Sequence, residues 1–379
     1  MARMMRLVAV LALIVVSFGG VRAAALAEAE KATAWTKTQQ QADGSFNGFG
    51  LGSTADAMYA LAAANVKVDD VATGGKNPQA FIEANIGDIA KSPGLAAKYV
   101  IAELLTGHSP RNVAGVNLVD VVIKSYNAET GVYGADVTTH ALAMLALVAA
   151  GEPIPAKAID ALGKYQLDDG SWSFTGDRTP KGGDTNTTSL AIQAFVAAQM
   201  RSHPAVDKGI SYLQSQQNAD GGFPYSKDSG FGSATDANST ALVIQAIVAT
   251  DGSPVMGPWA NVDGNPLAAL VKLQNSNGAF RYDAATPDDN TLATYQAIPA
   301  LLLKPFPLEA IVIAQPAPQP TAAPTSSVPA PSTPAPTQPG IPVGLPNTGA
   351  PINPILPVIV VVAFGMVLIG IRFRNVSDQ

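Results

Sequence analysis

Two kinds of apolar segment alternate along the middle of the chain. The first kind is amphipathic, with apolar residues at the three- to four-residue spacing of a helix and polar residues between them. Proline opens four of these segments, and proline is tolerated in the first turn of a helix. The pattern predicts six half-exposed helices, which are Ala27–Gln40, Pro78–Asn85, Val116–Tyr126, Pro155–Tyr165, Pro204–Gln216 and Pro266–Gln274.

The second kind of segment is apolar on nearly every side, and a helix without a polar face must be buried. These segments are Ala55–Asn65, Leu95–Thr106, Thr138–Ala150, Thr187–Met200, Ser239–Thr250 and Thr291–Leu302. Six half-exposed helices that alternate with six buried ones predict an all-α fold over residues 25–307, an α6/α6 toroid of six helical hairpins. The alternative is an open solenoid, which needs polar caps on its terminal repeats. The closed ring is favoured because neither the first nor the last segment has a capping face.

A short turn recurs between the two kinds of helix. It contains glutamine, then glycine, then an aromatic residue, as in Gln41…Gly44…Phe46, Gln166…Gly170…Trp172, Gln217…Gly221…Phe223 and Gln274…Gly278…Phe280, with degenerate copies at Gly131…Tyr133 and Gly87. This turn resembles the QW motif of the terpenoid cyclase and protein prenyltransferase toroid superfamily, over nearly all of residues 25–307. In that family the glutamine bonds to the backbone of a neighbouring helix end and the aromatic residue stacks on it. The resemblance therefore implies a structural role for Gln41, Gln166, Gln217 and Gln274.

Polar residues precede five of the buried helices, in the segments Ser53–Asp56, Asp136–His140, Asp184–Thr188, Asp236–Thr240 and Asp288–Thr291. Asp, Asn, Ser and Thr cap the free N–H groups of a helix start, and capping alone explains any single one of them. All inner helices of a toroid run in the same direction, however, so their starts meet at one mouth above an apolar floor, which is the usual form of a small-molecule site. Gln193, Gln245 and Gln296 lie inside the buried helices, where an amide needs either a neighbouring helix or a ligand as its partner.

Two of these helix starts are similar to those of the cobalamin carriers, intrinsic factor and transcobalamin. They are the segments 184–194 and 236–246. In the carriers the polar residues at this mouth contact the amide side chains of the corrin ring, so the resemblance implies cobalamin as a candidate ligand. The chain departs from the carriers because it has neither their smaller β domain nor their disulfides. The expected ligand-binding residues are Asp136, His140, Asp184, Asn186, Asp236, Asn238, Gln245 and Asp289.

The sequence argues less strongly for an enzyme. Triterpene cyclases use an Asp-x-Asp-Asp acid and pair two toroid domains, and the nearest acidic pairs here lack the preceding aspartate. No catalytic residue is assigned, and in the enzyme alternative Asp289, Asp184 or Asp236 is the candidate acid or base. A prenyltransferase needs zinc bound by Asp, Cys and His, but the chain has no cysteine and only three scattered histidines. No metal site or other cofactor is expected.

Composition narrows the partners. The chain of 379 residues is 47% hydrophobic and 14% charged, with a formal net charge of −6 and no cysteine. An acidic protein without a basic cluster is a poor partner for nucleic acid or anionic lipid. The absence of cysteine excludes disulfides and thiolate chemistry.

Both ends predict export. Residues 1–24 read as a signal peptide, with Arg3 and Arg6 before a short apolar run; an uncleaved anchor is the alternative. Residues 308–344 form a predicted Pro/Ala/Thr-rich stalk that lacks the material for a core. Residues 345–379 follow, with an apolar run at 355–371 and two arginines after it.

This last segment resembles the sorting signal of Gram-positive-type surface proteins. The pentapeptide that sortase recognises in that family corresponds to Leu345, Pro346, Asn347, Thr348 and Gly349. The resemblance implies attachment to the cell wall by sortase, and a retained single-pass membrane helix is the alternative. Either arrangement predicts an extracellular, surface-anchored domain.

The sequence thus favours a surface-anchored toroid that binds a small, cobalamin-like molecule at the mouth of its inner helices. Two alternatives stay open. One is an enzyme related to the terpene cyclases and prenyltransferases, and the other is an adhesive or spacer domain without a ligand.

Overall fold

The computed structural model describes residues 22–230 and 232–308 of the chain. These residues fall in a single compact unit. Most of the predicted signal peptide, the stalk beyond Leu308, the five sortase-recognition residues and the apolar run at 355–371 lie outside the described residues, so they stay predictions. In the described range, none of the helices has the length and hydropathy needed to cross a bilayer.

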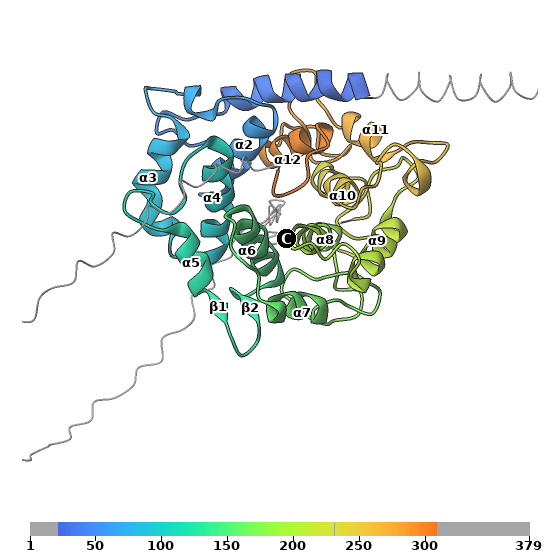
Figure 1. The fold of residues 1–379 in the computed structure, drawn as a ribbon. Helices are drawn as coiled ribbons and strands as arrows, with labels where there is room; N and C mark the ends of the chain where they lie inside the picture. Colours follow the sequence, from blue (N-terminus) through green and yellow to red (C-terminus); the bar gives the residue numbers. More distant parts are fainter. Residues whose placement is uncertain (1–21, 231, 309–379) are drawn as a thin grey trace, which may run out of the picture. The chain divides into compact units, whose positions relative to one another are not determined.

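Twelve helices alternate between an inner and an outer position in this unit (Figure 1). The inner helices are α2 (Gly52–Ala63), α4 (Pro93–Thr106), α6 (Val137–Ala149), α8 (Thr185–Ala197), α10 (Ala237–Ala249) and α12 (Thr291–Leu301). The outer helices are a helix at 22–38, then α3 (Pro78–Ile89), α5 (Leu118–Lys124), α7 (Ala156–Lys164), α9 (Pro204–Gln216) and α11 (Pro266–Val271). The remaining elements are the 3-10 turns η1 (Val68–Asp70) and η2 (Gly257–Trp259) and the antiparallel strands β1 (Tyr126–Asn127) and β2 (Val132–Tyr133).

The ring of inner helices is closed. Each inner helix packs on the next one along the chain, and α12 packs on α2. Two hydrogen bonds also join the ends of the ring, from Gln274 Nε2 to Glu28 O at 2.8 Å and from Tyr295 Oη to Asn47 O at 2.8 Å. The predicted all-α toroid is therefore confirmed for the described residues.

The starts of successive inner helices lie at one end of the ring. The first N–H of three of them donates to the loop that leads into the next inner helix: Val137 to Phe174 O, Thr185 to Tyr225 O and Ala237 to Tyr282 O. These bonds measure 3.1, 2.9 and 2.8 Å respectively. A repeated bond of this kind keeps neighbouring helices parallel and in step.

The recurring turn joins each hairpin to the next outer helix. Gln166 Nε2 donates to Gly170 O at 2.9 Å and to Ala205 O, at the start of α9, at 2.8 Å. Gly170 has a φ of +91°, and a Cβ there would lie 2.4 Å from Lys208 O, so glycine is required. Gln217 and Gln274 make the same pair of bonds in their own turns.

In the first repeat the structural glutamine is Gln40, so the expectation for Gln41 is wrong. Gln40 Nε2 donates to Val71 O at 2.8 Å, whereas Gln41 is exposed and its side chain donates to Gln39 O within its own turn. The glutamine lies four residues before the glycine in the other three turns, and Gln40 keeps that spacing from Gly44. The spacing was the signal that distinguishes the two glutamines.

Candidate functional site

The predicted rim aspartates are used by their own helices. Asp184 is fully buried, and its two oxygens accept from Thr187 N at 2.7 Å and Thr187 Oγ1 at 2.9 Å. Asp236 makes the same two bonds with Ser239, both at 2.7 Å, and half-buried Asp136 makes them with Thr139. The three carboxyl groups cap α8, α10 and α6, and only Asp136 is appreciably open to solvent.

Burial weakens the charge of this rim. It raises the pKa of Asp184 to about 6, although hydrogen bonds from Thr187 and Tyr225 oppose the shift. It raises the pKa of Asp236 to about 7, with the bonds from Ser239 opposing and the charge of Asp283 adding to the effect. The rim is therefore less anionic near neutral pH than the sequence indicates.

His140 holds two elements together. It is fully buried, its Nδ1 accepts from Tyr133 N at 3.1 Å, and its Nε2 lies 3.0 Å from Ala158 O. These partners require the tautomer with the proton on Nε2. Burial lowers the pKa of His140 to about 4, although the Ala158 carbonyl opposes the shift, so the ring is neutral.

The other predicted ligand residues divide between the axis and the surface. Asn238 Nδ2 donates to Gln296 Oε1 at 2.8 Å, which places both amides between α10 and α12. Asn186 is half-buried at the start of α8. Asp289 lies on the exposed loop before α12 and accepts from Asn275 Nδ2 and Asn277 Nδ2 at 2.8 and 2.6 Å. The eight residues thus do not converge on one opening, and their contact with a ligand stays a prediction.

A repeated hydrogen bond sets the register of the inner helices. The backbone N–H of each turn aromatic donates to a side chain in the first turn or two of the following inner helix, at 2.8 to 3.1 Å. The five accepting residues are Thr54, His140, Thr188, Thr240 and Thr294. These five residues are equivalent, so we call each one the register position of its helix. Residues at the same distance along the sequence from the register position lie at the same level in each inner helix.

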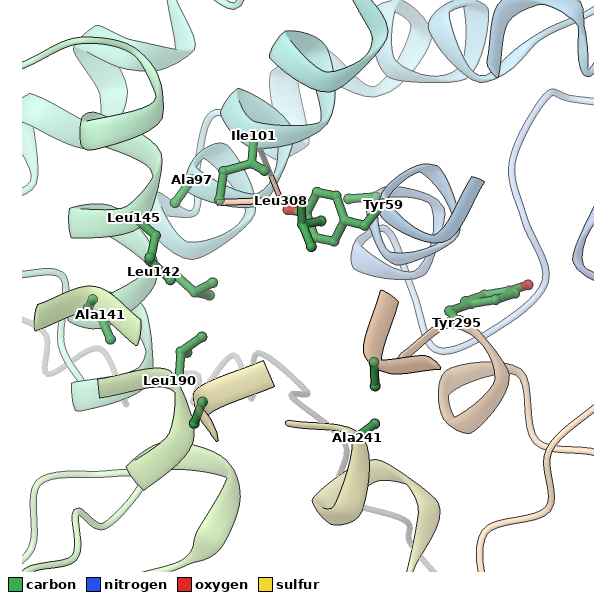
Figure 2. Close-up of a cluster of buried hydrophobic side chains, with 14 of the residues drawn as sticks. Tyr59, Ala97, Ile101, Ala141, Leu142, Leu145, Leu190, Ala241, Tyr295 and Leu308 are labelled. Carbon is green, nitrogen blue, oxygen red and sulfur yellow. The ribbon is translucent and has the colours of Figure 1, made fainter. Parts of the chain in front are cut away.

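Two residues further along, five inner helices contribute to a first axial layer. It consists of Asp56, Leu142, Leu190, Leu242 and Gln296, together with Lys98 of α4, whose Nζ lies 2.6 Å from Asp56 Oδ2. Leu142 and Leu190 point toward the axis of the ring in Figure 2. The layer is apolar on the side of α6, α8 and α10, and it carries an ion pair between α2 and α4.

Five residues after the register position lies a second axial layer. It consists of Tyr59, Leu145, Gln193, Gln245 and Pro299, together with Ile101 of α4. In Figure 2 Leu308, which comes from the segment that follows α12, lies beside Tyr59 on the side of the ring that also carries Ile101. The chain itself therefore supplies the group at the centre of this layer.

We call residues 304–308 the axial segment. Gln245 Nε2 donates to Lys304 O at 2.9 Å, and Phe306 N donates to Gln193 Oε1 at 2.9 Å. The Phe306 ring packs edge-on against Tyr59 with 5.4 Å between centroids, and Leu308 is 3% exposed. Two of the three glutamines predicted to need partners, Gln193 and Gln245, thus find them in this segment, and the third, Gln296, pairs with Asn238.

Little space remains beside the axial segment. A void of about 20 Å3 lies between the two layers, lined by Asp56, Tyr59, Leu242, Gln245, Tyr295, Gln296, Pro299 and Phe306. A void of that size holds about one water molecule. At this void, the described residues leave no room for a larger group while residues 304–308 are in place.

Asp56 and Lys98 form a buried ion pair at this site. They are 8% and 4% exposed. Burial raises the pKa of Asp56, while the charge and hydrogen bond of Lys98 oppose that shift. The sequence placed Asp56 only among the capping residues, but the register would have identified it, because three equivalent positions carry leucine.

Tyrosines surround the same carboxyl group. Besides burial, the charge of Asp56 raises the pKa of Tyr59, Tyr99 and Tyr295. Tyr295 lines the void, and its hydroxyl donates to the backbone oxygen of Asn47. Aromatic rings beside a carboxyl group form a site that tolerates positive charge in an otherwise apolar space.

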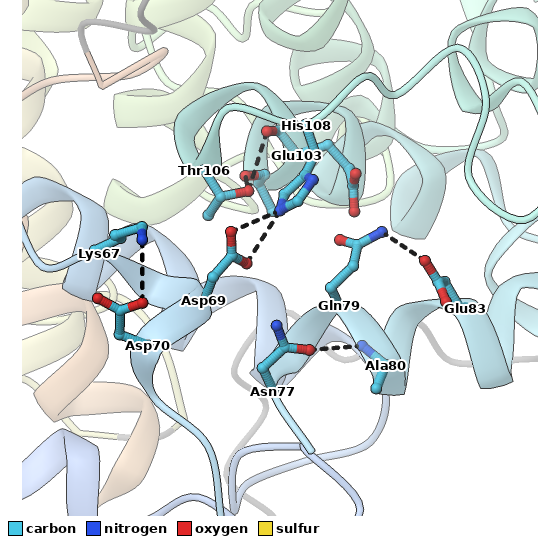
Figure 3. A network of polar contacts seen from close by, with 11 residues as sticks. Lys67, Asp69, Asp70, Asn77, Gln79, Ala80, Glu83, Glu103, Thr106 and His108 are labelled. Carbon is cyan, nitrogen blue, oxygen red and sulfur yellow. Dashed lines mark hydrogen bonds and ion pairs between the residues drawn. The ribbon is translucent and has the colours of Figure 1, made fainter. Parts of the chain in front are cut away.

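A second polar cluster lies between α3 and α4 (Figure 3). Glu103 of α4 is 1% exposed, and neither of its carboxyl oxygens has a hydrogen-bond partner. His108 Nε2 pairs with Asp69 at 3.0 Å beside it. Burial raises the pKa of Glu103 to about 7, with the charge of His108 opposing. Within residues 22–230 and 232–308, no group of three or more His, Asp or Glu side chains suits a metal ion.

The geometry can be compared with known families and structures. The squalene-hopene cyclase C-terminal domain family matches residues 126–237, and the prenyltransferase alpha-alpha toroid domain family matches residues 2–71. The fold is that of the terpene cyclase toroids. No curated protein matches the chain.

Solved structures agree on this fold. A type II terpene cyclase from Scytonema, in complex with geranylgeranyl dihydroxybenzoate, matches with 12% identity and a TM-score of 0.56 over 75% of this chain and 98% of its own. A protein from Actinoplanes matches with 14% identity and a TM-score of 0.53, over 74% and 98%. An unsaturated glucuronyl hydrolase from Bacillus sp. GL1 matches with 12% identity and a TM-score of 0.51, over 74% and 96%.

One expectation is corrected by these matches. The sequence counts a single toroid against a triterpene cyclase, which pairs two such domains, whereas 75% of this chain covers 98% of the type II terpene cyclase from Scytonema. A single toroid is therefore no argument against a cyclase-like protein.

Proposed function

We propose that this protein is a terpene cyclase-like toroid that binds an isoprenoid-type hydrocarbon chain along its axis. The observation that carries the proposal is the composition of the two axial layers. Ile101, Leu142, Leu145, Leu190 and Leu242 offer an apolar wall with only one ion pair among the axial positions. Burying a hydrocarbon against such a wall stabilises a complex by roughly 25 cal/mol per Å2 of apolar surface.

The polar groups of the axis lie on one side, which suits a ligand with a single polar end. The Asp56–Lys98 pair and the Gln296 amide belong to α2, α4 and α12, while α6, α8 and α10 contribute leucines to the same layer. A few polar groups beside an apolar wall orient a ligand without providing most of its binding energy. The complex of the Scytonema cyclase with a geranylgeranyl compound supports an isoprenoid as the ligand class.

Cyclisation is the second candidate, and Asp56 carries it. A type II cyclisation starts with protonation of the hydrocarbon by a carboxylic acid, and neighbouring aromatic rings stabilise the cation that forms. Asp56 lies in the axis beside Tyr59 and Tyr295, which suits both tasks. Lys98 opposes this role, because its charge favours the ionised carboxylate. Binding is therefore our leading proposal, and product formation that is lost in Asp56→Asn would establish catalysis.

A corrinoid at the helix-start mouth stays a proposal of lower rank. The similarity of segments 184–194 and 236–246 to the cobalamin carriers supports it. The geometry supports it less, because the cap bonds occupy Asp184 and Asp236. Attachment at the cell surface by sortase rests on residues 345–349 and is tested by the loss of surface protein in Thr348→Ala.

Titration of the full chain with dansyl-labelled geranylgeraniol tests the leading proposal. We expect saturable one-to-one binding that Leu242→Asn weakens about tenfold, which corresponds to about 1.4 kcal/mol. Leu26→Asn is the matched control, because Leu26 is 44% exposed on the first outer helix. Circular dichroism melting verifies that both variants fold.

Two outcomes would overturn the proposal. One is the absence of saturable binding by the folded full chain. The other is an equal loss of affinity in Leu242→Asn and Leu26→Asn, which would place the probe outside the axis. A thermal shift with cobalamin, but none with the isoprenoid, would move the site to the mouth.

A further inference from the structure

The axial segment makes the kinds of contact that a ligand would make. Its two direct hydrogen bonds to the second axial layer involve the side-chain amides of Gln193 and Gln245, while its own groups are backbone atoms. Phe306 and Leu308 add an aromatic and an aliphatic side chain to the same layer. A ligand with an apolar chain and one polar group offers the same chemistry.

The axial site does not have enough free volume to hold the segment and a ligand together. Small-molecule sites typically enclose roughly 300 Å3 or more. The void beside the segment measures about 20 Å3. Residues 304–308 must therefore leave the axis before an isoprenoid chain enters the second layer.

The segment begins directly after the C-terminal cap of α12. Leu303 has a φ of +56° and Lys304 N donates to Pro299 O at 2.9 Å, which is the left-handed cap that also ends the other inner helices. Leu308, at the end of the segment, has a φ of +62° outside any helix cap. A left-handed conformation costs roughly 1–2 kcal/mol for a residue other than glycine. The packing of Leu308 offsets this cost, so a ligand that replaces the packing relieves the backbone at Leu308 and leaves the cap of α12 in place.

From these observations we infer that residues 304–308 are an intramolecular competitor, which occupies the axial site until an apolar ligand displaces it. This inference rests on the proposed function, because it concerns the same site. It adds that the measured ligand affinity depends on the difference between the free energy with which the ligand occupies the axis and the free energy with which residues 304–308 occupy it. Weakening the segment should then strengthen ligand binding, which is the reverse of the usual effect of losing an apolar side chain near a site.

The test compares two phenylalanines in the full chain. Phe306→Ala removes the contact with Tyr59, and we expect it to bind dansyl-labelled geranylgeraniol about tenfold more tightly than the unaltered chain. Phe49→Ala is the matched control, because Phe49 is 55% exposed on the loop before α2, and its affinity should not change. Leu308→Ala, which keeps the Phe306 ring, should act in the same direction as Phe306→Ala and provides a second variant if Phe306→Ala fails to fold.

Hydrogen exchange of the unaltered chain gives an independent measurement. The Phe306 amide donates to Gln193 in the free protein, so it should be protected and should lose that protection when the probe binds. Unchanged or weaker affinity in the segment variants, with Phe306 still protected in the complex, would overturn the inference while the axial binding stands. If the folded chain binds no apolar probe at all, the proposed function fails instead.

Discussion

The two sides of the axis share one backbone register but differ in chemistry. At the first axial layer α6, α8 and α10 present Leu142, Leu190 and Leu242, whereas α2 and α4 present Asp56 and Lys98. The six inner helices described contain three aspartate, glutamate, lysine or arginine residues, and all three lie on α2 or α4. They are Asp56, Lys98 and Glu103. We call α6, α8 and α10 the leucine side and α2 and α4 the charged side. The leucine side shows that the fold forms with an apolar residue at this position, so folding alone does not explain the ion pair on the charged side.

Removing one partner of the ion pair should have the largest effect. Lys98→Ala leaves Asp56 buried without its counter-charge, and such a loss typically costs about 3–5 kcal/mol of unfolding free energy. Urea denaturation at neutral pH measures this change. Lys91→Ala is the control, because the Lys91–Asp88 pair is exposed.

Replacing both partners with leucine turns the charged side into a copy of the leucine side. The double variant Asp56→Leu, Lys98→Leu should be as stable as the unaltered chain, or more stable by about 1–4 kcal/mol, since a well-packed apolar pair often matches a buried ion pair. A double variant as unstable as Lys98→Ala would contradict the view that the pair is unnecessary for folding.

The buried Glu103 should make stability depend on pH. Its pKa rises from 4.5 to about 7 in the folded protein. The folded state therefore retains a proton that the unfolded chain releases, and stability is fully present below pH 4.5 and falls as the pH rises toward 7. At roughly 1.4 kcal/mol per unit, the loss amounts to about 3 kcal/mol.

Glu103→Gln removes this dependence. The variant should match the unaltered chain near pH 4 and exceed its unfolding free energy by about 3 kcal/mol at pH 7, as measured by urea denaturation at each pH. The difference between the two proteins isolates Glu103 from Asp184 and Asp236, whose raised pKa values of about 6 and 7 also make stability fall as the pH rises. It likewise isolates Glu103 from His140, whose lowered pKa of about 4 makes stability fall as the pH drops below 6.5. Exposed Glu30→Gln is the control. A constant difference across this range would contradict the expectation.

The repeated turn with glutamine, glycine and an aromatic residue is needed for folding. Gly170→Ala combines a φ of +91° with a Cβ 2.4 Å from Lys208 O, so we expect a loss of about 2–3 kcal/mol, since strain at a special φ and steric overlap both destabilise. Gly115→Ala is the matched control, because its φ is +85° and nothing lies within 4 Å of the added Cβ. Its loss should be about 1 kcal/mol. Equal losses in thermal unfolding would show that the turn does not depend on this close approach.

The sequence predicted the ring because its signals are local. Apolar periodicity located all twelve helices, and Asp136, Asp184 and Asp236 marked helix starts that the structure confirms as caps. The axial site was missed because its identity depends on register across helices that are distant in the sequence. Asp56 looks like a capping residue until Thr54 is aligned with Thr188 through their bonds to the turn aromatics.

The axial segment had no sequence signal of its own. Residues 304–308 follow the last apolar helix and combine two prolines with Phe306 and Leu308, a composition typical of many loops. Their position depends on Gln193 and Gln245, whose need for a partner was recognised although the partner was not. Long-range contacts of this kind require three-dimensional coordinates.

Substitution of the rim residue Asp184 should have the smallest effect, and it tests whether the ligand contacts the rim or only the axis. Asp184→Asn keeps an oxygen that accepts the N–H of Thr187, and asparagine caps a helix about as well as aspartate does. Thermal unfolding at pH 7 should therefore change by only a few tenths of a kcal/mol, and isoprenoid affinity should not change. Asp184→Ala, which removes the cap, should cost about 1–2 kcal/mol and still leave the affinity unaltered. A marked loss of affinity in Asp184→Asn, with stability retained, would mean that the rim carboxyl contacts the ligand in addition to the axial leucines.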